Sequence, residues 1–223
     1  MSAHQVVIGA LNPHENCYSI GSVDGLNFIA CAVGSDVVIL ASDFQRIQVI
    51  PGSAYKREEI VSSINCCADS GKVSVCYGST IRILEPTLSD GKSGNIFSYR
   101  WVESQSIELD AIVDSVQWVL DGLRLLVLAD CDLLLYQHKM LSTAVNDKPS
   151  PSGVKFVLSD EDSAWEIVWR TKLSSKVKYV KFSPDGSLFA TCGEKDRFVK
   201  IWYQERGKDN FVSLLDKYKI IFC

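Results

Sequence analysis

The stretch from Val177 to Trp202 constrains the fold more than any other part of the chain and reads VKYVKFSPDGSLFATCGEKDRFVKIW. Three apolar runs, rich in the β-branched and aromatic residues that half-buried strands prefer, are separated by two turns. In the first turn Pro184 fixes φ at the start and Gly186 tolerates a positive φ at the end. The stretch therefore predicts three consecutive antiparallel strands.

The same pattern of strand, short turn and strand occurs four times. The copies are FIACAVGSDVVIL (28–40), VSVCYGSTIRIL (73–84), LLVLADCDLLLY (125–136) and the run 188–202. Further strand-like runs precede three of them, at 60–66, 112–118 and 176–182. Recurrence at roughly 40–45 residues is typical of WD-type propeller blades, and loop insertions explain the longer later spacings. The sequence predicts an all-β fold, a WD40-type β-propeller. Propellers use about 4–8 blades. We expect this chain to supply about four blades of a ring that has more, which would leave an incomplete ring, an open arc.

The repeats set the expected domain organisation. We expect a partial WD-repeat propeller over 1–215, with blade-like units near 1–55, 56–110, 111–172 and 173–215, and a divergent or truncated tail over 216–223. Two polar insertions, 86–94 and 142–162, precede outer strands expected at 96–102 and 165–171. Exposed loops of this kind bind partners in some proteins and are plain spacers in others, and both readings stay open.

The composition indicates a chain of the cytoplasm. No apolar run approaches the roughly 18 residues of a membrane-spanning helix, and the N-terminus lacks the features of a signal peptide. The eight cysteines contain no C-x-x-C pair, which favours small buried thiols over a disulfide framework. A zinc site from His14, Cys17 and a remote ligand is the alternative, but paired ligand spacing is missing.

Charge is unevenly spread along the chain, whose formal net charge is −4. Residues 170–223 hold 12 basic and 6 acidic side chains, whereas residues 1–169 hold 11 basic and 21 acidic ones. A basic stripe runs through Arg170, Lys172, Lys176, Lys178 and Lys181. The acidic chain as a whole disfavours nucleic acid, so we interpret the stripe as a solvated strand edge. Contact with an acidic partner, or peripheral association with an anionic membrane, is compatible with it.

The sequence contains partial matches to catalytic motifs, but each lacks residues that the motif requires. Asp90-Gly91-Lys92-Ser93 ends like a phosphate-binding loop, but Pro86 stands where the first glycine is needed and a strand is expected afterwards. The three histidines, His4, His14 and His138, lack a nucleophile context, and Asp160, Glu161 and Asp162 form a solvated cluster. We therefore expect no enzyme and no cofactor. A hydrolase would require His138 or a loop acid to be buried in a pocket.

We expect the polar residues of the clearest repeat to have a structural role. WD blades commonly link their strands by a buried hydrogen-bond set, and Thr191, Asp196 and Trp202 occupy three of its places. WD blades commonly have a histidine ahead of the first strand as a further member of this set. Leu173 stands at that position here, as Leu109 does in the preceding unit, so we expect an apolar contact in place of the histidine hydrogen bond. With Asp185 and Gly186 of the turn, these residues are expected to stabilise the blade. The sequence identifies no partner-binding residues.

Beyond the repeat, the chain resembles the N-terminal WD-repeat region of the DmX-like (rabconnectin) family of very large proteins. The resemblance rests on the opening HQV, GA and NP (4–6, 9–10, 12–13), on DVVIL, SDF and IPG (36–40, 42–44, 50–52), on ILEP (83–86), and on FSPDG, LFAT and VKIWY (182–186, 188–191, 199–203). It extends to about Leu215. Family chains continue further, so the resemblance implies a short isoform or fragment.

This resemblance implies a non-catalytic scaffold. Such proteins promote assembly of the vacuolar-type proton ATPase in a RAVE-like complex, together with another WD-repeat subunit and the pump subunits. They are linked to acidification of vesicles and endolysosomes, and some associate with Rab regulators on synaptic vesicles. The alternative is a generic cytosolic WD-repeat adaptor in trafficking or ubiquitin-ligase recruitment. Docking of partners on rigid blades would be the mechanism in either case.

Overall fold

Every strand in the described part of the chain belongs to one of four antiparallel sheets. The computed structural model describes residues 9–52, 60–89, 94–139, 165–183, 185–193, 199–204 and 211–214. Each sheet has four strands, and in each the strands lie side by side in the order of the sequence. The fold is therefore all-β, with four successive meanders.

The strand bounds follow the repeat. Sheet A contains β1 (Tyr18–Val23), β2 (Leu26–Val33), β3 (Asp36–Ala41) and β4 (Arg46–Ile50). Sheet B contains β5 (Val61–Cys66), β6 (Val73–Tyr77), β7 (Thr80–Leu88) and β8 (Tyr99–Glu108), the last preceded by the 3-10 turn η1 (Ile96–Ser98). Sheet C contains β9 (Ser115–Trp118), β10 (Arg124–Ala129), β11 (Asp132–His138) and β12 (Trp165–Lys172). Sheet D contains β13 (Val177–Phe182), β14 (Leu188–Gly193), β15 (Val199–Gln204) and β16 (Phe211–Ser213).

Tight turns with left-handed residues connect the strands. Asp24 and Gly25, between β1 and β2, have φ of 49° and 76°. Asp130, at the start of the β10–β11 turn, has φ of 53°. Two-residue hairpins favour such turns because their twist matches the twist of the flanking strands, and Asp and Gly tolerate positive φ.

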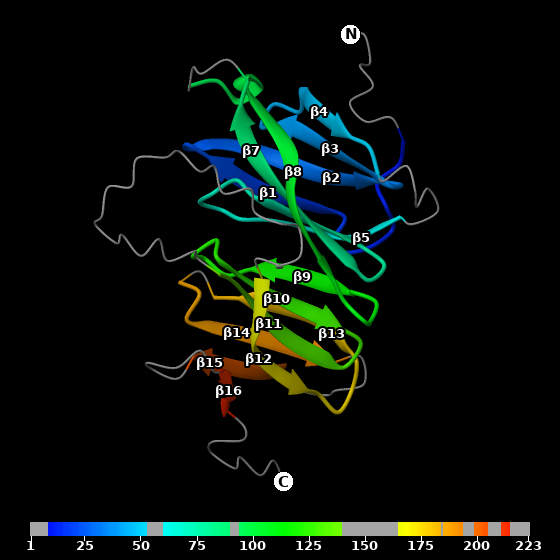
Figure 1. Cartoon of the computed structure of the whole chain (residues 1–223), viewed down its shortest axis with the longest axis vertical. Coiled ribbons are helices and arrows are strands. Elements are labelled where there is room, and N and C mark those ends of the chain that lie inside the picture. The colour runs from blue at the N-terminus through cyan, green and yellow to red at the C-terminus, as the bar shows by residue number, and fades with distance from the viewer. Residues whose placement is uncertain are drawn as a thin grey trace, which may run out of the picture.

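Sheets A and B lie in one half of the molecule along its long axis and sheets C and D in the other (Figure 1). The first strands lie at a common inner edge, since β5 contacts both β1 and β9. This is the arrangement of propeller blades around an axis. Among the described residues, sheets A and D share side-chain contacts at the inner edge but no hydrophobic core, so the ring is not closed between them.

A hydrophobic core fills each interface between successive sheets. The A–B core centres on Phe28 and Trp101, whose ring centroids are 4.6 Å apart. The B–C core includes Trp118 from β9, and the C–D core includes Phe189 stacked on Trp202. Burial of one such side chain contributes about 1.5–3 kcal/mol, so these cores hold neighbouring sheets together.

The predicted hairpins at 28–40, 73–84 and 125–136 are present with their turns in the expected places. Three boundaries were wrong. Strand β7 continues through Pro86 to Leu88, where a loop was expected, because Pro86 pairs with Trp101 at the sheet edge and its missing N–H costs no ladder bond there. The outer strand expected at 96–102 begins only at Tyr99, after a 3-10 turn capped by the Asn95 side chain. The run 112–118 is a strand only from Ser115.

The domain division stays a prediction. The four sheets span Tyr18–Ile50, Val61–Glu108, Ser115–Lys172 and Val177–Ser213. The expected tail at 216–223 and the whole of the predicted insertion at 142–162 lie outside the described residues.

Candidate functional site

Two of the predicted blade residues meet in the interior of sheet D. The Trp202 indole Nε1 donates a hydrogen bond of 2.9 Å to the Thr191 hydroxyl oxygen, and both side chains are buried. Asp196 lies outside the described residues. Leu173 is buried in the C–D core, and Leu109 is partly buried against the B–C core. A stabilising role for this set stays a prediction.

Asp185 and Gly186 shape the turn before β14. Asp185 accepts hydrogen bonds from the Ser183 hydroxyl (2.5 Å) and the Ser187 hydroxyl (2.8 Å). These bonds to Ser183, and then those to Ser187, lower the pKa of Asp185 to about 2. Gly186 has φ of 69°, and a Cβ there would lie 3.1 Å from Leu120, which is in the β9–β10 connection of sheet C. The turn therefore also contacts the neighbouring sheet.

Amide side chains connect neighbouring sheets at tryptophan residues, which the sequence reasoning missed. Gln48 of sheet A donates to the Trp101 carbonyl (2.9 Å) and accepts from the Trp101 N–H (2.8 Å). In the B–C interface the Asn65 side chain accepts from the Trp118 N–H (2.8 Å), and the Gln105 side chain accepts from the Trp165 indole (2.5 Å). No pattern within one repeat marks these pairs, because each amide lies four strands before its tryptophan, in the preceding sheet.

Polar contacts cross the inner edge of the four sheets. The Tyr179 hydroxyl of β13 donates to Glu15, which precedes β1, over 2.5 Å. Lys176 forms an ion pair of 2.6 Å with Asp114, and Lys178 lies 4.0 Å from Glu15. Because these side chains are largely solvated, each pair contributes little to stability.

The basic stripe predicted from the sequence is thus engaged in ion pairs at several positions. Besides Lys176 and Lys178, Arg170 pairs with Asp132 over 2.7 Å. Such pairing fits the interpretation as a solvated strand edge better than a phosphate-binding surface, where the cations would be available to a ligand.

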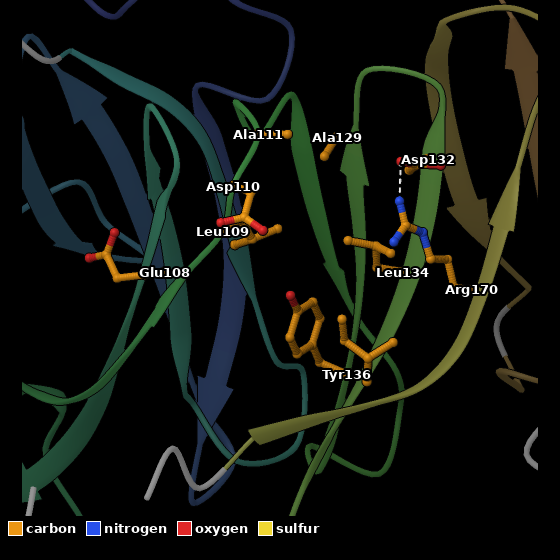
Figure 2. A pocket seen from close by; sticks show the side chains of 10 residues that line it. Glu108, Leu109, Asp110, Ala111, Ala129, Asp132, Leu134, Tyr136 and Arg170 are labelled. Carbon is orange, nitrogen blue, oxygen red and sulfur yellow. Dashed lines mark hydrogen bonds and ion pairs between the residues drawn. The ribbon is translucent and has the colours of Figure 1, made fainter. Parts of the chain in front are cut away.

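A recess of about 270 Å³ lies between the β8–β9 connection and strands β10 to β12 (Figure 2). Its walls are formed by Glu108, Leu109, Asp110, Ala111, Ala129, Asp132, Leu134, Tyr136, Ile167 and Arg170. Burial raises the pKa of Tyr136, and the Asp110 carboxylate raises it further. The Thr80 hydroxyl donates to Glu108, and Asp132 pairs with Arg170. The recess can accept hydrogen-bond donors through its carboxylates, and its lining holds no serine, threonine, cysteine, lysine or histidine side chain.

His138, the residue required by the hydrolase alternative, is held by two neighbours. Its Nε2 lies 3.0 Å from the Gln105 amide, and its ring meets Trp165 edge to face with centroids 5.1 Å apart. Burial lowers the pKa of His138, so the neutral ring is favoured. These contacts place it in the B–C interface and away from the lining of the recess.

The described cysteines are free thiols. Burial raises the pKa of Cys66 to about 12 and that of Cys31 to about 11. A thiol with a raised pKa is protonated at neutral pH and a poor nucleophile or ligand. Within the described ranges no group of three or more His, Cys, Asp or Glu side chains could hold a metal ion, and His14 and Cys17 gain no further ligand. The residues Asp90 to Ser93 lie outside the described residues.

The helices in the described residues include none that is long and apolar enough to cross a membrane.

Four meanders whose first strands meet at one inner edge, with a hydrophobic core in each interface, define a β-propeller scaffold of the WD-repeat class. No family model matches the chain. It is, however, 36% identical over 218 residues to DmX-like protein 1 of Mus musculus, a match that covers 97% of the chain and 7% of that relative. It is also 36% identical over 205 residues to DmX-like protein 1 of Homo sapiens, covering 91% of the chain and 6% of the relative.

The chain belongs to the DmX-like family, which confirms the resemblance seen in the sequence. It spans less than a tenth of the length of these relatives. A solved structure of a protein from Lactobacillus plantarum matches with a TM-score of 0.54 at 6% identity, covering 84% of the chain and 53% of that protein. This likeness concerns the fold alone.

Proposed function

We propose that the chain is a non-catalytic WD-repeat scaffold that promotes assembly of the vacuolar-type proton ATPase. The observation that carries the proposal is the 36% identity to DmX-like protein 1 over 97% of the chain. The partners would be another WD-repeat subunit, subunits of the pump and Rab regulators. The result would be acidification of vesicles and endolysosomes, with the chain in the cytoplasm and peripheral on their membranes.

The fold supports docking as the mechanism. Hydrophobic cores and paired amide bonds fix each sheet against the next, so the loops and edges of the sheets keep constant positions. A surface fixed before binding loses little conformational entropy when a partner docks. In this proposal affinity comes from surface complementarity, and no bond is made or broken.

The surroundings of His138 also favour docking over hydrolysis. A hydrolytic histidine needs a nucleophile or an activated water at one ring nitrogen and an orienting group at the other. The Nε2 of His138 is instead directed at the Gln105 amide, and its ring packs on Trp165. A side chain used in this way stabilises an interface between sheets.

The proposal is tested by capture from cell extract with the tagged chain as bait. Proton-pump subunits and a second WD-repeat protein should be recovered, and identified by mass spectrometry, after washes at physiological salt. The matched control is the same chain with Gly186→Val, in which the φ of 69° is strained and Leu120 is crowded, so that the β13–β14 turn of sheet D and its contact with sheet C are disrupted. Recovery of pump subunits by both baits at equal levels would show non-specific capture and contradict the proposal.

The second candidate function is that of a generic WD-repeat adaptor in trafficking or ubiquitin-ligase recruitment. The propeller arrangement favours it, because many unrelated functions are carried by the same fold. Recovery of another stable complex without pump subunits would support the adaptor and refute the pump scaffold.

A further inference from the structure

Tyr136 of β11 has a buried side chain whose hydroxyl lacks a hydrogen-bond partner. The side chain is only 6% exposed, and no hydrogen bond joins its hydroxyl to any residue in the described part of the chain. Buried tyrosine hydroxyls usually have such a partner. The hydroxyl points into the recess between the β8–β9 connection and strands β10 to β12 (Figure 2). It is therefore available to a group that enters the recess.

The Asp110 carboxylate of the β8–β9 connection faces this hydroxyl (Figure 2). It is near enough to raise the pKa of Tyr136, but no hydrogen bond joins the two groups. Within the described ranges the carboxylate has no hydrogen bond and no ion pair of its own. A donor with several N–H bonds can reach a carboxylate and a hydroxyl oxygen at the same time, so the gap between the two suits such a group.

The other charged groups of the recess are already engaged. Glu108 accepts a hydrogen bond of 2.8 Å from the Thr80 hydroxyl, and Arg170 pairs with Asp132 over 2.7 Å. With three carboxylates and one guanidinium, the lining has a formal net charge of −2. The recess therefore attracts a cation, and Asp110 is the place where its negative charge is least compensated.

The backbone around Asp110 is fixed before anything binds. The Leu109 N–H donates to the Ser79 carbonyl over 2.9 Å, and the Val113 N–H donates to the Gly78 carbonyl over 2.8 Å. Both bonds hold the β8–β9 connection on the β6–β7 turn of sheet B. A carboxylate held in this way loses little conformational entropy when it binds a ligand.

The rest of the lining is apolar and leads out to the surface. It consists of Leu109, Ala111, Ala129, Leu134 and Ile167, of which Ile167 is 48% exposed. The volume of about 270 Å³ is roughly nine times the ~30 Å³ that a water molecule occupies in the liquid, which leaves room for a side chain of about five or six heavy atoms. Long cationic side chains pack their methylene groups along apolar surface and place their charge at a polar end.

We propose that this recess binds a lysine side chain of a protein partner. The ammonium group donates hydrogen bonds to the Asp110 carboxylate and the Tyr136 hydroxyl oxygen, while the methylene groups pack on Leu134 and Ile167. Lysine suits the recess better than arginine, because a compact ammonium with three donors reaches two separate acceptors, whereas the flat fork of arginine matches the two oxygens of one carboxylate. The site is independent of the pump-scaffold function, since any partner with an exposed lysine could use it.

A nuclear magnetic resonance titration of the full chain, labelled with ¹⁵N, tests the inference with the peptide acetyl-Gly-Lys-Gly-amide as probe. Backbone signals of residues 109–111 and 167 should shift and saturate with a dissociation constant of about 1–10 mM, the range expected for a contact of a few atoms. The same peptide with norleucine in place of lysine lacks the ammonium group and should bind at least about tenfold more weakly. The arginine peptide should also bind more weakly than the lysine peptide.

Substitutions of the two acceptors separate their contributions. Asp110→Asn keeps the shape of the side chain and removes its charge, so binding of the lysine peptide should weaken by about five- to tenfold. Tyr136→Phe removes one neutral acceptor and should weaken binding by about two- to fivefold. Asp43→Asn makes the same change of charge in the exposed β3–β4 turn and should bind like the wild type. The spectrum of each free variant checks its fold, and Asp110 is exposed, so its substitution decides even if Tyr136→Phe perturbs the B–C core.

Several results would overturn the inference. One is the absence of a saturable shift up to about 50 mM lysine peptide, and another is saturation confined to residues away from the recess. Equal affinity for the norleucine or arginine peptide would contradict the assignment to lysine. An Asp110→Asn chain that binds the lysine peptide as tightly as the wild type would show that the carboxylate does not hold the ammonium group.

Discussion

Replacing Gln48 with Met should loosen the interface between sheets A and B. The Gln48 amide forms two hydrogen bonds, of 2.9 and 2.8 Å, with the backbone of Trp101. Trp101 is only 1% exposed, so water reaches its N–H and C=O poorly once the amide is gone. Met keeps nearly the same volume and removes the polar atoms, which separates hydrogen bonding from packing.

The structure allows the size of this effect to be worked out. An unpaired buried backbone group costs about 1–3 kcal/mol, and water is expected to satisfy one of the two groups, so the free energy of unfolding should fall by about 1–3 kcal/mol. For a chain of 223 residues each kcal/mol lowers the Tm by about 2–4 °C, which gives a decrease of about 2–12 °C. Urea unfolding should show a lower midpoint with an unchanged slope, because the surface exposed on unfolding stays the same.

Gln45→Met is the matched control on the same β3–β4 hairpin. The Gln45 amide is exposed and bonds only Asp43, so its loss should change the free energy of unfolding by less than about 0.5 kcal/mol. If the Gln48 variant is no less stable than the Gln45 variant, the amide bonds do not hold sheets A and B together and the reasoning is wrong.

Three further predictions concern other parts of the chain. Thr191→Val leaves the Trp202 indole N–H buried without an acceptor and should lower the free energy of unfolding by about 1–3 kcal/mol in urea titrations. The pKa of Asp185 is lowered in the fold to about 2 from 3.8, so its stabilising effect is complete above about pH 4 and is lost as the pH falls towards 2; Asp185→Asn should flatten this acid limb of the stability curve. Burial raises the pKa of Cys66 to about 12 and also raises that of Cys76, so a maleimide should label both only after unfolding.

Each of these has a control in the chain. Thr87→Val removes an exposed hydroxyl from β7 and should leave the free energy of unfolding unchanged. A loss of stability in this variant would mean that the Thr→Val substitution itself, and not the bond to Trp202, destabilises the protein. Asp43→Asn, in the exposed β3–β4 turn, should not flatten the acid limb. Cys17 is partly exposed and should react in the native state. Native labelling of Cys76 as fast as that of Cys17 would mean that the B–C core opens readily.

Alternation and turn chemistry made most of the fold predictable. In FIACAVGSDVVIL the apolar runs flank Gly34, whose φ is 63°, and the hairpin forms where the turn residues are. The first and last strands of sheet A were harder, because β1 contains Gly21 and polar serines and β4 is short. Gly21 is required by packing, since a Cβ there would lie 2.5 Å from the Phe28 ring, and a requirement of this kind appears only when two segments meet.

The candidate site was less predictable than the fold. The pairing of Thr191 with Trp202 follows from the spacing of the repeat, whereas the pairing of Gln48 with Trp101 joins residues 53 positions apart in different sheets. The recess near Asp110 depends on how the β8–β9 connection passes over sheet C. A single sequence carries no signal for such distances.

The arrangement of the cores has a consequence for how the chain loses order. Sheets B and C each have a neighbour on both sides, whereas sheets A and D each pack on one described sheet. In a linear array coupled only through nearest neighbours, melting starts where the coupling is weakest, at the two extremities. Unfolding of sheet D would therefore stay confined to the last repeat. Loss of the packing between Trp118 and Trp165 in the B–C core would instead leave two pairs of sheets, each with a single hydrophobic core to stabilise it.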